Sequence, residues 1–229
     1  MTTRVQYAGI DFTFHYQASD LSGLGAIAEI CTRNEYLLSS FRDCKDEVFI
    51  DIGANIGVAT VIMAKLNPDS LIYAFEPYVP AYELLLRNIE ANKTTNVKPF
   101  NYAITDKNAT QNLLVFGTMS GANSLHANAP GFKRAYHAVS EQVVKTCAFD
   151  TLLEDNRIKA IRLLKIDCEG SEYEILYNTK YINCIQNIVG EFHNLKDRAE
   201  HNGEKLIAYC RTKVKGLVHV SVLDLTNQY

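Results

Sequence analysis

The stretch that decides the fold is Val48-Phe49-Ile50-Asp51-Ile52-Gly53-Ala54-Asn55-Ile56-Gly57. It starts with an apolar run of the kind found in a buried strand, and Asp51 ends that run. Gly53 and Gly57 can adopt the left-handed backbone that lets the chain reverse. The helix predicted over residues 58–66 then directs its N-terminus at a ligand. The stretch therefore predicts a strand, a tight turn and a helix that hold a nucleotide-type cofactor.

Two residues of this turn favour S-adenosylmethionine over a dinucleotide. A dinucleotide-binding turn reads G-x-G-x-x-G, and its second glycine lets the pyrophosphate approach the backbone. Asn55 stands at that position here. Asp51 would repel a diphosphate but attract the positively charged amino group of the methionine moiety, directly or through water. We therefore expect S-adenosylmethionine, with an NAD-dependent oxidoreductase as the alternative.

A second carboxylate follows the next predicted strand, in the run Phe75-Glu76-Pro77. An acid about 20 residues beyond such a turn lies where the ribose is recognised. We expect Glu76 to accept hydrogen bonds from both ribose hydroxyls, each contributing about 1.5 to 3 kcal/mol. The alternative is a solvated carboxylate at a strand end.

From residue 47 onward, strand-like runs alternate with helical ones. The predicted strands span residues 48–52, 71–75, 97–104, 161–166, 187–192 and 217–225. Pro80 suits the first turn of one helix, and capping-box patterns beginning at Thr151 and Ser171 open two others. The alternation predicts an α/β fold, a mostly parallel twisted sheet with helices on both faces and the ligand site at the carboxyl ends of the strands.

The 229 residues suit one α/β domain with additions. Residues 1–46 are predicted to form a small N-terminal cap, with two short β-prone runs around Ala8-Gly9 followed by helix and loop. Residues 47–229 form the main domain. Residues 110–147 are an insertion within it, in which 112–116 and 143–147 read as extra strands joined by a long loop. Such loops are often lids or substrate contacts, and otherwise surface excursions.

Composition limits the partners and the location. A net charge of −3 gives no reason to expect nucleic acid or acidic membrane. The polar start and the lack of a long apolar segment predict neither a signal peptide nor a membrane span, so we expect a soluble cytoplasmic protein. The cysteines form no C-x-x-C pair and are read as reduced thiols; they are Cys31, Cys44, Cys147, Cys168, Cys184 and Cys210.

Five motifs together resemble the FkbM family of methyltransferases. They are D-I-G-A-N-I-G from Asp51, F-E-P from Phe75, D-T-L-L from Asp150, L-K-I-D-C-E-G-S-E from Leu164 and G-E-F-H from Gly190. The K-I-D-x-E-G-x-E run is the most specific, and the resemblance extends roughly over residues 48–193. It implies a class I Rossmann-like methyltransferase fold, S-adenosylmethionine as cofactor, and O-methylation of a hydroxyl on a natural product or sugar.

The resemblance also assigns individual residues to the cofactor. These are Asp51, Gly53, Asn55, Gly57, Glu76, Tyr102, Ala103 and Asp167. Tyr102 and Ala103 would lie along the adenine, and Asp167 near the methionine moiety and the transferred methyl. The chain leaves little room after the sixth strand for the antiparallel seventh strand of the wider class.

A hydroxyl acceptor must lose its proton when its oxygen takes a methyl group, so the site needs a base. The candidates are Asp167 and Glu169 after the fourth strand, and Glu191 and His193 after the fifth. His193 has the ordinary pKa closest to neutral pH. Each has a structural alternative: Asp167 orients the cofactor, Glu169 accepts from backbone donors at the following helix start, and His193 is a surface hydrogen-bond donor.

The insertion offers polar side chains to an acceptor. Ser120, Asn123 and Ser124 could donate hydrogen bonds, while the basic group around Arg134 (Lys133 and His137) could meet an anionic or sugar-like molecule. A solvated loop face is the alternative. The expected partner is a small-molecule or carbohydrate acceptor, and the oligomeric state is not predicted.

No metal is expected. Asp167, Glu191 and His193 could hold a divalent ion, but an imidazole is a second-choice ligand for magnesium. Turnover is therefore predicted to be metal-independent. Outside enzymes, the alternative is a catalytically inactive module that binds S-adenosylmethionine and acts through a partner.

Overall fold

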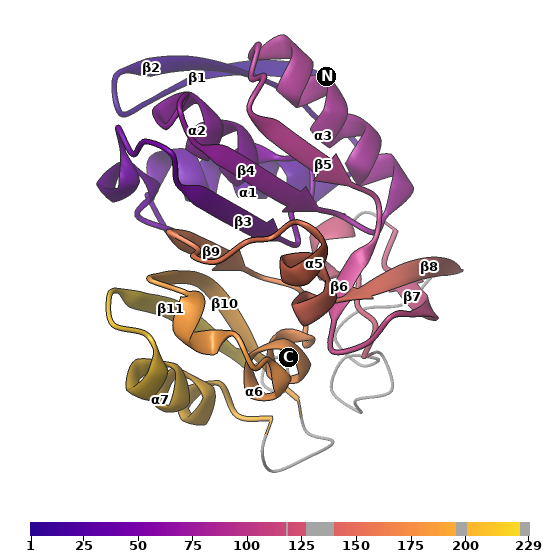
Figure 1. Cartoon of the computed structure of the whole chain (residues 1–229). Helices are drawn as coiled ribbons and strands as arrows, with labels where there is room; N and C mark the ends of the chain where they lie inside the picture. Colours follow the sequence, from indigo (N-terminus) through magenta and orange to yellow (C-terminus); the bar gives the residue numbers. More distant parts are fainter. Residues whose placement is uncertain (118, 127–139, 196–200, 225–229) are drawn as a thin grey trace.

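The computed structural model describes residues 1–117, 119–126, 140–195 and 201–224. At its centre lies a six-stranded sheet in the order β11-β10-β9-β3-β4-β5, in which all neighbours are parallel (Figure 1). The strands are β3 (Val48–Ile52), β4 (Leu71–Phe75), β5 (Val97–Phe100), β9 (Leu163–Ile166), β10 (Ile188–Asn194) and β11 (Val218–Asp224). The predicted parallel sheet is confirmed.

The order of the strands sets the position of the ligand site. The chain runs outward from β3 through β4 to β5 and then returns to the other side of β3 with β9. Ligands of open α/β sheets bind at the carboxyl ends of the strands on either side of such a reversal, here at the ends of β3 and β9. β10 pairs directly with β11 in parallel register, Ile188 opposite Val218, so no antiparallel strand lies between them.

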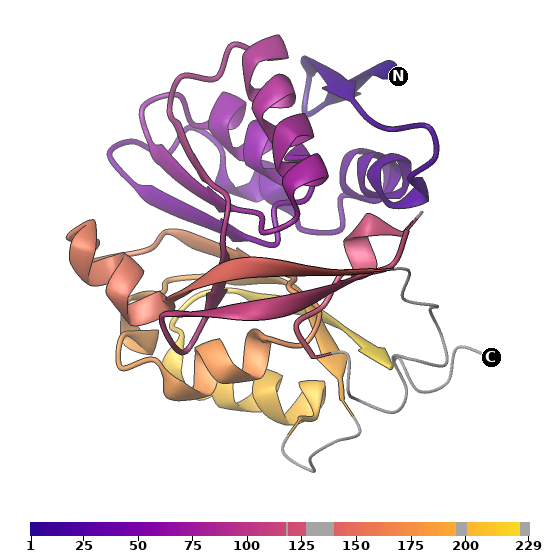
Figure 2. The ribbon, with the colours of Figure 1, turned by 90° about the vertical axis from the view of Figure 1, so that its right-hand side faces the viewer.

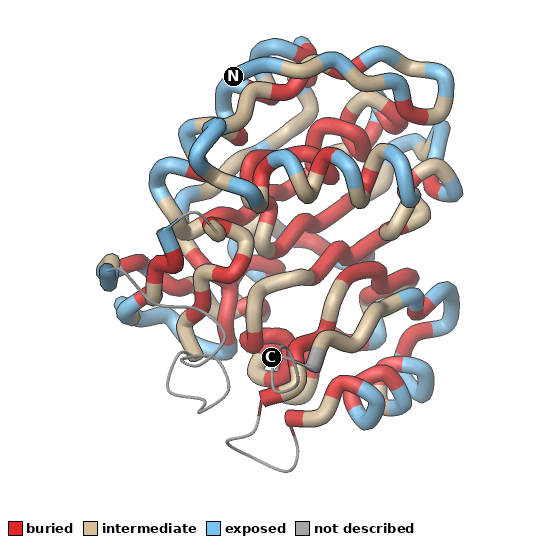
Figure 3. The backbone as a smooth tube through the Cα atoms, turned by 180° about the vertical axis from the view of Figure 1, so that it is seen from behind, coloured by how far each residue is buried: buried red, intermediate tan, exposed pale blue. Residues whose placement is uncertain are grey.

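Helices cover both faces of the sheet because successive strand residues point to opposite sides. Ile50 and Ile52 pack with α5 (Phe149–Asp155), α6 (Glu172–Asn178) and α7 (Gly203–Lys213). Phe49, between them in sequence, packs with α1 (Leu21–Thr32) and α2 (Val58–Leu66). Figure 3 shows the buried strands at the centre and exposed residues on the outer helix faces. No described helix has both the length and the apolarity that crossing a bilayer requires.

The N-terminal segment forms a hairpin of β1 (Thr2–Tyr7) and β2 (Ile10–His15), followed by α1 and the short helix η1 (Leu38–Phe41). Buried amides of α3 (Val79–Ala91) hold the hairpin. The side chain of Asn88 accepts a hydrogen bond from His15 N at 2.6 Å and donates to His15 O at 3.0 Å. Pro80 lies in the first turn of α3, as predicted.

The insertion adds a three-stranded sheet in the order β6-β8-β7, formed by β6 (Ala103–Thr105), β7 (Ala109–Val115) and β8 (Ser140–Ala148). The two predicted extra strands are thus confirmed and are longer than expected. A short helix after β7, η2 (Ser120–Ala122), lies beside α1 (Figure 2). The insertion and the N-terminal segment therefore meet, with Ser120 N donating to the carboxylate of Asp20 at 3.2 Å.

One predicted strand is wrong. Residues 97–104 form two strands, β5 and β6, which belong to different sheets. The break falls at Asn101, whose side-chain amide donates to the backbone carbonyls of Glu76 and Pro77 at 2.9 and 3.1 Å. The chain bends there because this amide is tied to the loop after β4.

The two predicted capping boxes are wrong in detail. α5 begins at Phe149, two residues before Thr151, and no side chain caps it. α6 does begin after Ser171, but the Ser171 hydroxyl contacts the ring of His126 at 3.1 Å and caps no backbone N–H. The carboxylate of Glu172 instead accepts from two N–H groups of the loop before the helix, those of Cys168 and Gly170.

Candidate active site

The turn after β3 has the left-handed backbone that the glycines predicted. φ is +78° at Gly53, +50° at Asn55 and +85° at Gly57. A Cβ at Gly53 would lie 1.8 Å from the carbonyl oxygen of Asp167, so the loop after β9 packs directly on this glycine. Gly53 is thus required by the packing of the protein itself, as well as by the turn.

Glu76 joins the end of β4 to this turn. One carboxylate oxygen accepts a hydrogen bond from Asn55 N and the other from Tyr78 N, each at 2.8 Å. Burial raises the pKa of Glu76 to about 7, and these two bonds offset only part of the shift. Each oxygen keeps a further lone pair, so the carboxylate can also accept from a ligand.

An inner pocket opens at the ends of β3 and β4. Its apolar wall consists of Ile52, Phe75, Pro77, Ala103, Ile104, Leu113 and Leu125. Glu76 and Asn55 lie on its polar side. Apolar walls for an adenine and a carboxylate for a ribose fit the adenosine part of S-adenosylmethionine.

An outer cleft lies between α1, η2 and the ends of β9 and β10. Its charged and phenolic lining residues are Glu29, Arg33, Glu35, Tyr36, Lys165, Asp167, Glu169 and Glu191. The inner pocket and the outer cleft share the wall residues Gly53, Asn55, Gly121, Asp167 and Glu169. The two spaces are therefore neighbours, divided at the carboxyl ends of β3 and β9.

Lys165 neutralises the acids at this divide. It is 3% exposed, and its ammonium lies 3.2 Å from Asp51 Oδ1 and 3.8 Å from Asp167 Oδ2. Thr60 donates to the other oxygen of Asp51 at 2.5 Å. Tyr36 donates to Asp167 Oδ2 at 3.0 Å. Burial opposes the charge on Lys165, but the two carboxylates raise its pKa, so the ammonium form is favoured.

This arrangement bears on the expected contact of Asp51 with the cofactor. Asp51 is fully buried and lines neither the inner pocket nor the outer cleft, whereas Lys165 and Asp167 line the outer cleft. The contact stays a prediction, and the geometry favours its indirect form. Lys165 was missed by the sequence reasoning, although it shares a strand face with Asp167 and is the register partner of Asp51 across β3 and β9.

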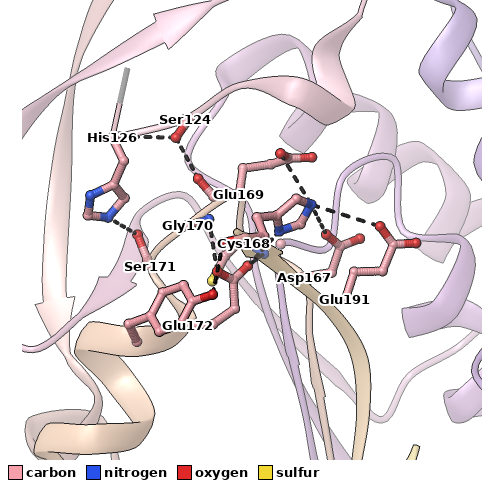
Figure 4. A network of polar contacts seen from close by, with 12 residues as sticks. Ser124, His126, Asp167, Cys168, Glu169, Gly170, Ser171, Glu172 and Glu191 are labelled. Atoms are coloured by element: carbon pink, nitrogen blue, oxygen red, sulfur yellow. Dashed lines mark hydrogen bonds and ion pairs between the residues drawn. The ribbon is translucent and has the colours of Figure 1, made fainter. Parts of the chain in front are cut away.

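Four carboxylates surround His193, which is fully buried on β10. His193 Nδ1 lies 3.0 Å from Glu172 Oε1. His193 Nε2 lies 3.3 Å from Glu169, 3.9 Å from Glu191 and 4.0 Å from Asp167. Figure 4 shows these three carboxylates around one ring nitrogen, each joined to it by a dashed line.

The charged residues in this cluster shift one another's pKa values. Burial opposes a charged His193, but Glu169 and Glu172 outweigh it and raise the pKa of His193 well above its ordinary value. The neutral-pH pKa expected for His193 is therefore wrong, because the residue lies among acids and not at the surface. Burial, with neighbouring carboxylates, raises the pKa of Glu169 and of Glu191. The pKa of Glu172 is lowered, since His193 and backbone N–H bonds outweigh its burial.

The loop after β9 is fixed by Glu172, not by Glu169 as the structural alternative supposed. Glu172 accepts from Cys168 N at 3.0 Å and from Gly170 N at 2.9 Å. Glu169 has φ of +54°, and its backbone carbonyl accepts from the Ser124 hydroxyl at 2.5 Å (Figure 4). The side chain of Glu169 is thereby free to face His193.

Of the remaining predicted residues, some line the inner pocket and one packs outside its lining. Ala103 lines the inner pocket, while Tyr102 is not in its lining and packs against Phe75 and Phe100 with ring centroids 5.5 and 5.4 Å away. Ser120 and Asn123 also line the inner pocket, which places them beside the expected cofactor.

Of the other residues predicted from the insertion, the structure describes Ser124, which lines neither space. Ser124 is buried and bonds to the loop after β9. Lys133, Arg134 and His137 lie outside the described residues. The outer cleft instead takes much of its wall from α1, a role that no sequence motif indicated.

Together, the sheet order and the pocket at its reversal define a Rossmann-like α/β fold with a pocket placed for a nucleotide-type cofactor. A family model described as "Methyltransferase FkbM domain" matches residues 51–214, and the chain belongs to this family. It is a methyltransferase that uses S-adenosylmethionine, which removes the NAD-dependent alternative.

Relatives in several organisms carry methyltransferase names. "Methyltransferase 1" of Beauveria bassiana is 28% identical over 189 residues, covering 73% of this chain and 75% of that protein. "Hexuronic acid methyltransferase AglP" of Haloferax volcanii is 27% identical over 154 residues, covering 65% and 57%.

Solved structures are more distant. A SAM-dependent methyltransferase from Agrobacterium tumefaciens has a TM-score of 0.42 at 10% identity, covering 93% of this chain and 49% of that one. M. jannaschii TYW2 in complex with AdoMet has a TM-score of 0.31 at 18% identity, covering 49% and 64%. The matched part thus spans less than two thirds of either solved chain.

Proposed function

We propose that this FkbM methyltransferase O-methylates a hydroxyl group of a small-molecule or carbohydrate acceptor. The observation that carries the proposal is the wall shared by the inner pocket and the outer cleft, to which Asp167 and Glu169 contribute. A cofactor in the inner pocket and an acceptor in the outer cleft would meet at these carboxylates. Methyl transfer requires such an in-line arrangement of nucleophile and methyl group.

The charges at the shared wall suit this cofactor. Asp167 lies in this wall, Asp51 and Glu172 are buried behind it, and the cations beside them are Lys165 and His193. These five groups sum to one net negative charge, and Glu169 or Glu191 adds to it when ionised. S-adenosylmethionine carries a sulfonium and an ammonium, so this surface favours it electrostatically.

S-adenosylmethionine supplies a methyl group bonded to positively charged sulfur. The acceptor oxygen forms the new O–C bond as the S–C bond breaks, and the hydroxyl proton must leave. Glu191 lines the outer cleft but not the inner pocket, so it faces the acceptor side. We assign the proton to the Glu191 carboxylate, whose ionised form is favoured by the positive charge of a bound cofactor. Tyr36 and Lys165 hold Asp167 beside it.

The surroundings of the cleft support a small acceptor. Glu29 and Glu35 add negative charge to its walls, which disfavours a nucleic-acid backbone. The relative AglP is named for a hexuronic acid, a carbohydrate with free hydroxyls. These features favour a polyhydroxylated molecule over RNA or DNA.

The test uses methyl-labelled S-adenosylmethionine with a panel of neutral sugars, uronic acids and hydroxylated natural products, followed by mass spectrometry. We expect label in a methoxy group. Glu191→Gln should lower turnover by about 100- to 10,000-fold, the usual contribution of a general base, with S-adenosylhomocysteine affinity retained. Glu83→Gln, the same change at an exposed position on α3, is the control. Label on nitrogen, or no transfer to any acceptor by a protein that binds the cofactor, would contradict the proposal.

A further inference from the structure

We propose that Asp167, Glu169 and His193 bind a divalent metal ion at the inner end of the outer cleft. Two carboxylates and one imidazole suit an ion that accepts mixed oxygen and nitrogen ligands, such as Mn²⁺. The site departs from the metal-independent reaction that the sequence predicted. Metal binding itself does not depend on which acceptor the enzyme methylates.

The spacing of the three side chains fits one ion. One ligand atom from each lies within 4.8 Å of the others. His193 Nε2 is 3.3 Å from Glu169 Oε2 and 4.0 Å from Asp167 Oδ1. Ligands about 2.1 Å from an octahedral ion lie about 3 Å apart when adjacent and about 4 Å apart when opposite. Small side-chain movements would therefore complete the coordination.

The orientation of His193 also fits a ligand. Its Nδ1 lies 3.0 Å from Glu172 Oε1, and Glu172 is itself fixed by the backbone N–H groups of Cys168 and Gly170. With Nδ1–H donated to Glu172, a binding ion displaces the Nε2 proton and takes the Nε2 lone pair, which points at Asp167 and Glu169. Metal-binding histidines in proteins almost always donate their other ring N–H to such a partner.

An independent observation concerns unmet hydrogen bonds. His193 Nε2 is buried and makes no hydrogen bond with any described residue. The carboxylate of Glu169 lies 3.3 Å from Nε2 in an ion pair, whereas Glu172 also accepts hydrogen bonds from two backbone groups. Buried polar groups are normally hydrogen-bonded. An ion bound between Nε2 and these carboxylates would satisfy both.

The position of this site gives the ion a role, and this step rests on the proposed function. Asp167 and Glu169 belong to the wall shared by the inner pocket and the outer cleft. An ion there could take an acceptor hydroxyl as a further ligand and lower its pKa. Glu191, with its carboxylate 3.9 Å from His193 Nε2, lies beside the ion to receive the proton.

The test measures binding without acceptor or cofactor. The full chain, stripped with EDTA, is titrated with MnCl₂ by isothermal titration calorimetry and by the electron paramagnetic resonance signal of free Mn²⁺. We expect one Mn²⁺ per chain. Glu169→Gln, which removes a ligand, and Glu172→Gln, which removes the partner of His193, should each weaken binding by about 10- to 100-fold. Glu35→Gln, an acid of the cleft outside the cluster, should change it by no more than about twofold.

Three results decide the matter. Failure of the wild-type chain to bind Mn²⁺ saturably, or equal affinity in wild type and a folded Glu169→Gln variant, would overturn the metal site. If the deeply buried Glu172→Gln variant does not fold by circular dichroism, the Glu169→Gln titration alone is decisive. Absence of methyl transfer with every acceptor, in a protein that binds Mn²⁺ as expected, would count against the proposed function and leave the metal site standing.

Discussion

Lys165→Met tests the ion pair that connects the glycine turn to the acidic loop. The substitution keeps a long side chain but leaves Asp51 fully buried without its cation 3.2 Å away. Two unit charges at that distance attract by about 5 kcal/mol at an effective dielectric constant of about 20. Removing one partner of a buried pair costs about 3 to 5 kcal/mol in practice. The free energy of unfolding should fall by that amount, measured by urea denaturation at pH 7.

The second substitution in the cycle is Asp51→Asn. If the loss comes from an unpaired buried charge, Asp51→Asn combined with Lys165→Met should recover about 2 kcal/mol or more, because no ion is then left uncompensated. A loss below about 1 kcal/mol for Lys165→Met would refute the reasoning. If the double variant recovers no stability, the loss comes instead from packing or from the hydrogen bond that Lys165 donates to Gly53 O at 2.7 Å.

Further variants test other contacts. The pKa of Glu76 is raised to about 7 in the folded protein. Ionisation of this buried carboxyl therefore costs no stability at pH 4, where it is protonated, and lowers the free energy of unfolding by about 3 kcal/mol as the pH rises through 7. Glu76→Gln should remove that slope from chemical denaturation series, and an unchanged slope would reject the shift. Gly53→Ala should prevent stable folding at 37 °C, because its Cβ would lie 1.8 Å from Asp167 O, and a wild-type melting temperature would contradict the close approach. Asn88→Ala should cost about 2 to 3 kcal/mol, since it leaves the part-buried backbone groups of His15 and the buried carbonyl of Ile56 without their partner, and a change below about 0.5 kcal/mol would mean that other contacts hold the hairpin.

Much of the fold follows from local pattern. The strand, turn and helix from Val48 to Leu66 could be predicted because apolar runs and glycines act within a few residues of each other. The break between β5 and β6 could not, since it depends on Asn101 bonding to the loop after β4. The cap at Ser171 could not be predicted locally either, because its hydroxyl contacts the ring of His126, 45 positions away in the chain.

The candidate site was predictable where residues lie at strand ends. Asp167, Glu169, Glu191 and His193 do meet, as adjacent parallel strands require. The crowding of acids that raises the pKa of His193 was not evident, because it depends on how the Glu169 and Glu172 side chains turn. Tyr36 reaches Asp167 across 131 positions of sequence with no motif to indicate it.

We infer that the cofactor occupies the inner pocket and the acceptor the outer cleft, and calorimetric binding of S-adenosylhomocysteine tests this arrangement most directly. Ala103 lines the inner pocket, whereas Gly25 lines the outer cleft with no atom within 4 Å of an added Cβ. Ala103→Leu should weaken binding about tenfold or more, about 1.4 kcal/mol, while Gly25→Trp should leave it within about twofold and impair only turnover of the acceptor. Unchanged affinity in folded Ala103→Leu together with lost affinity in Gly25→Trp would contradict the account.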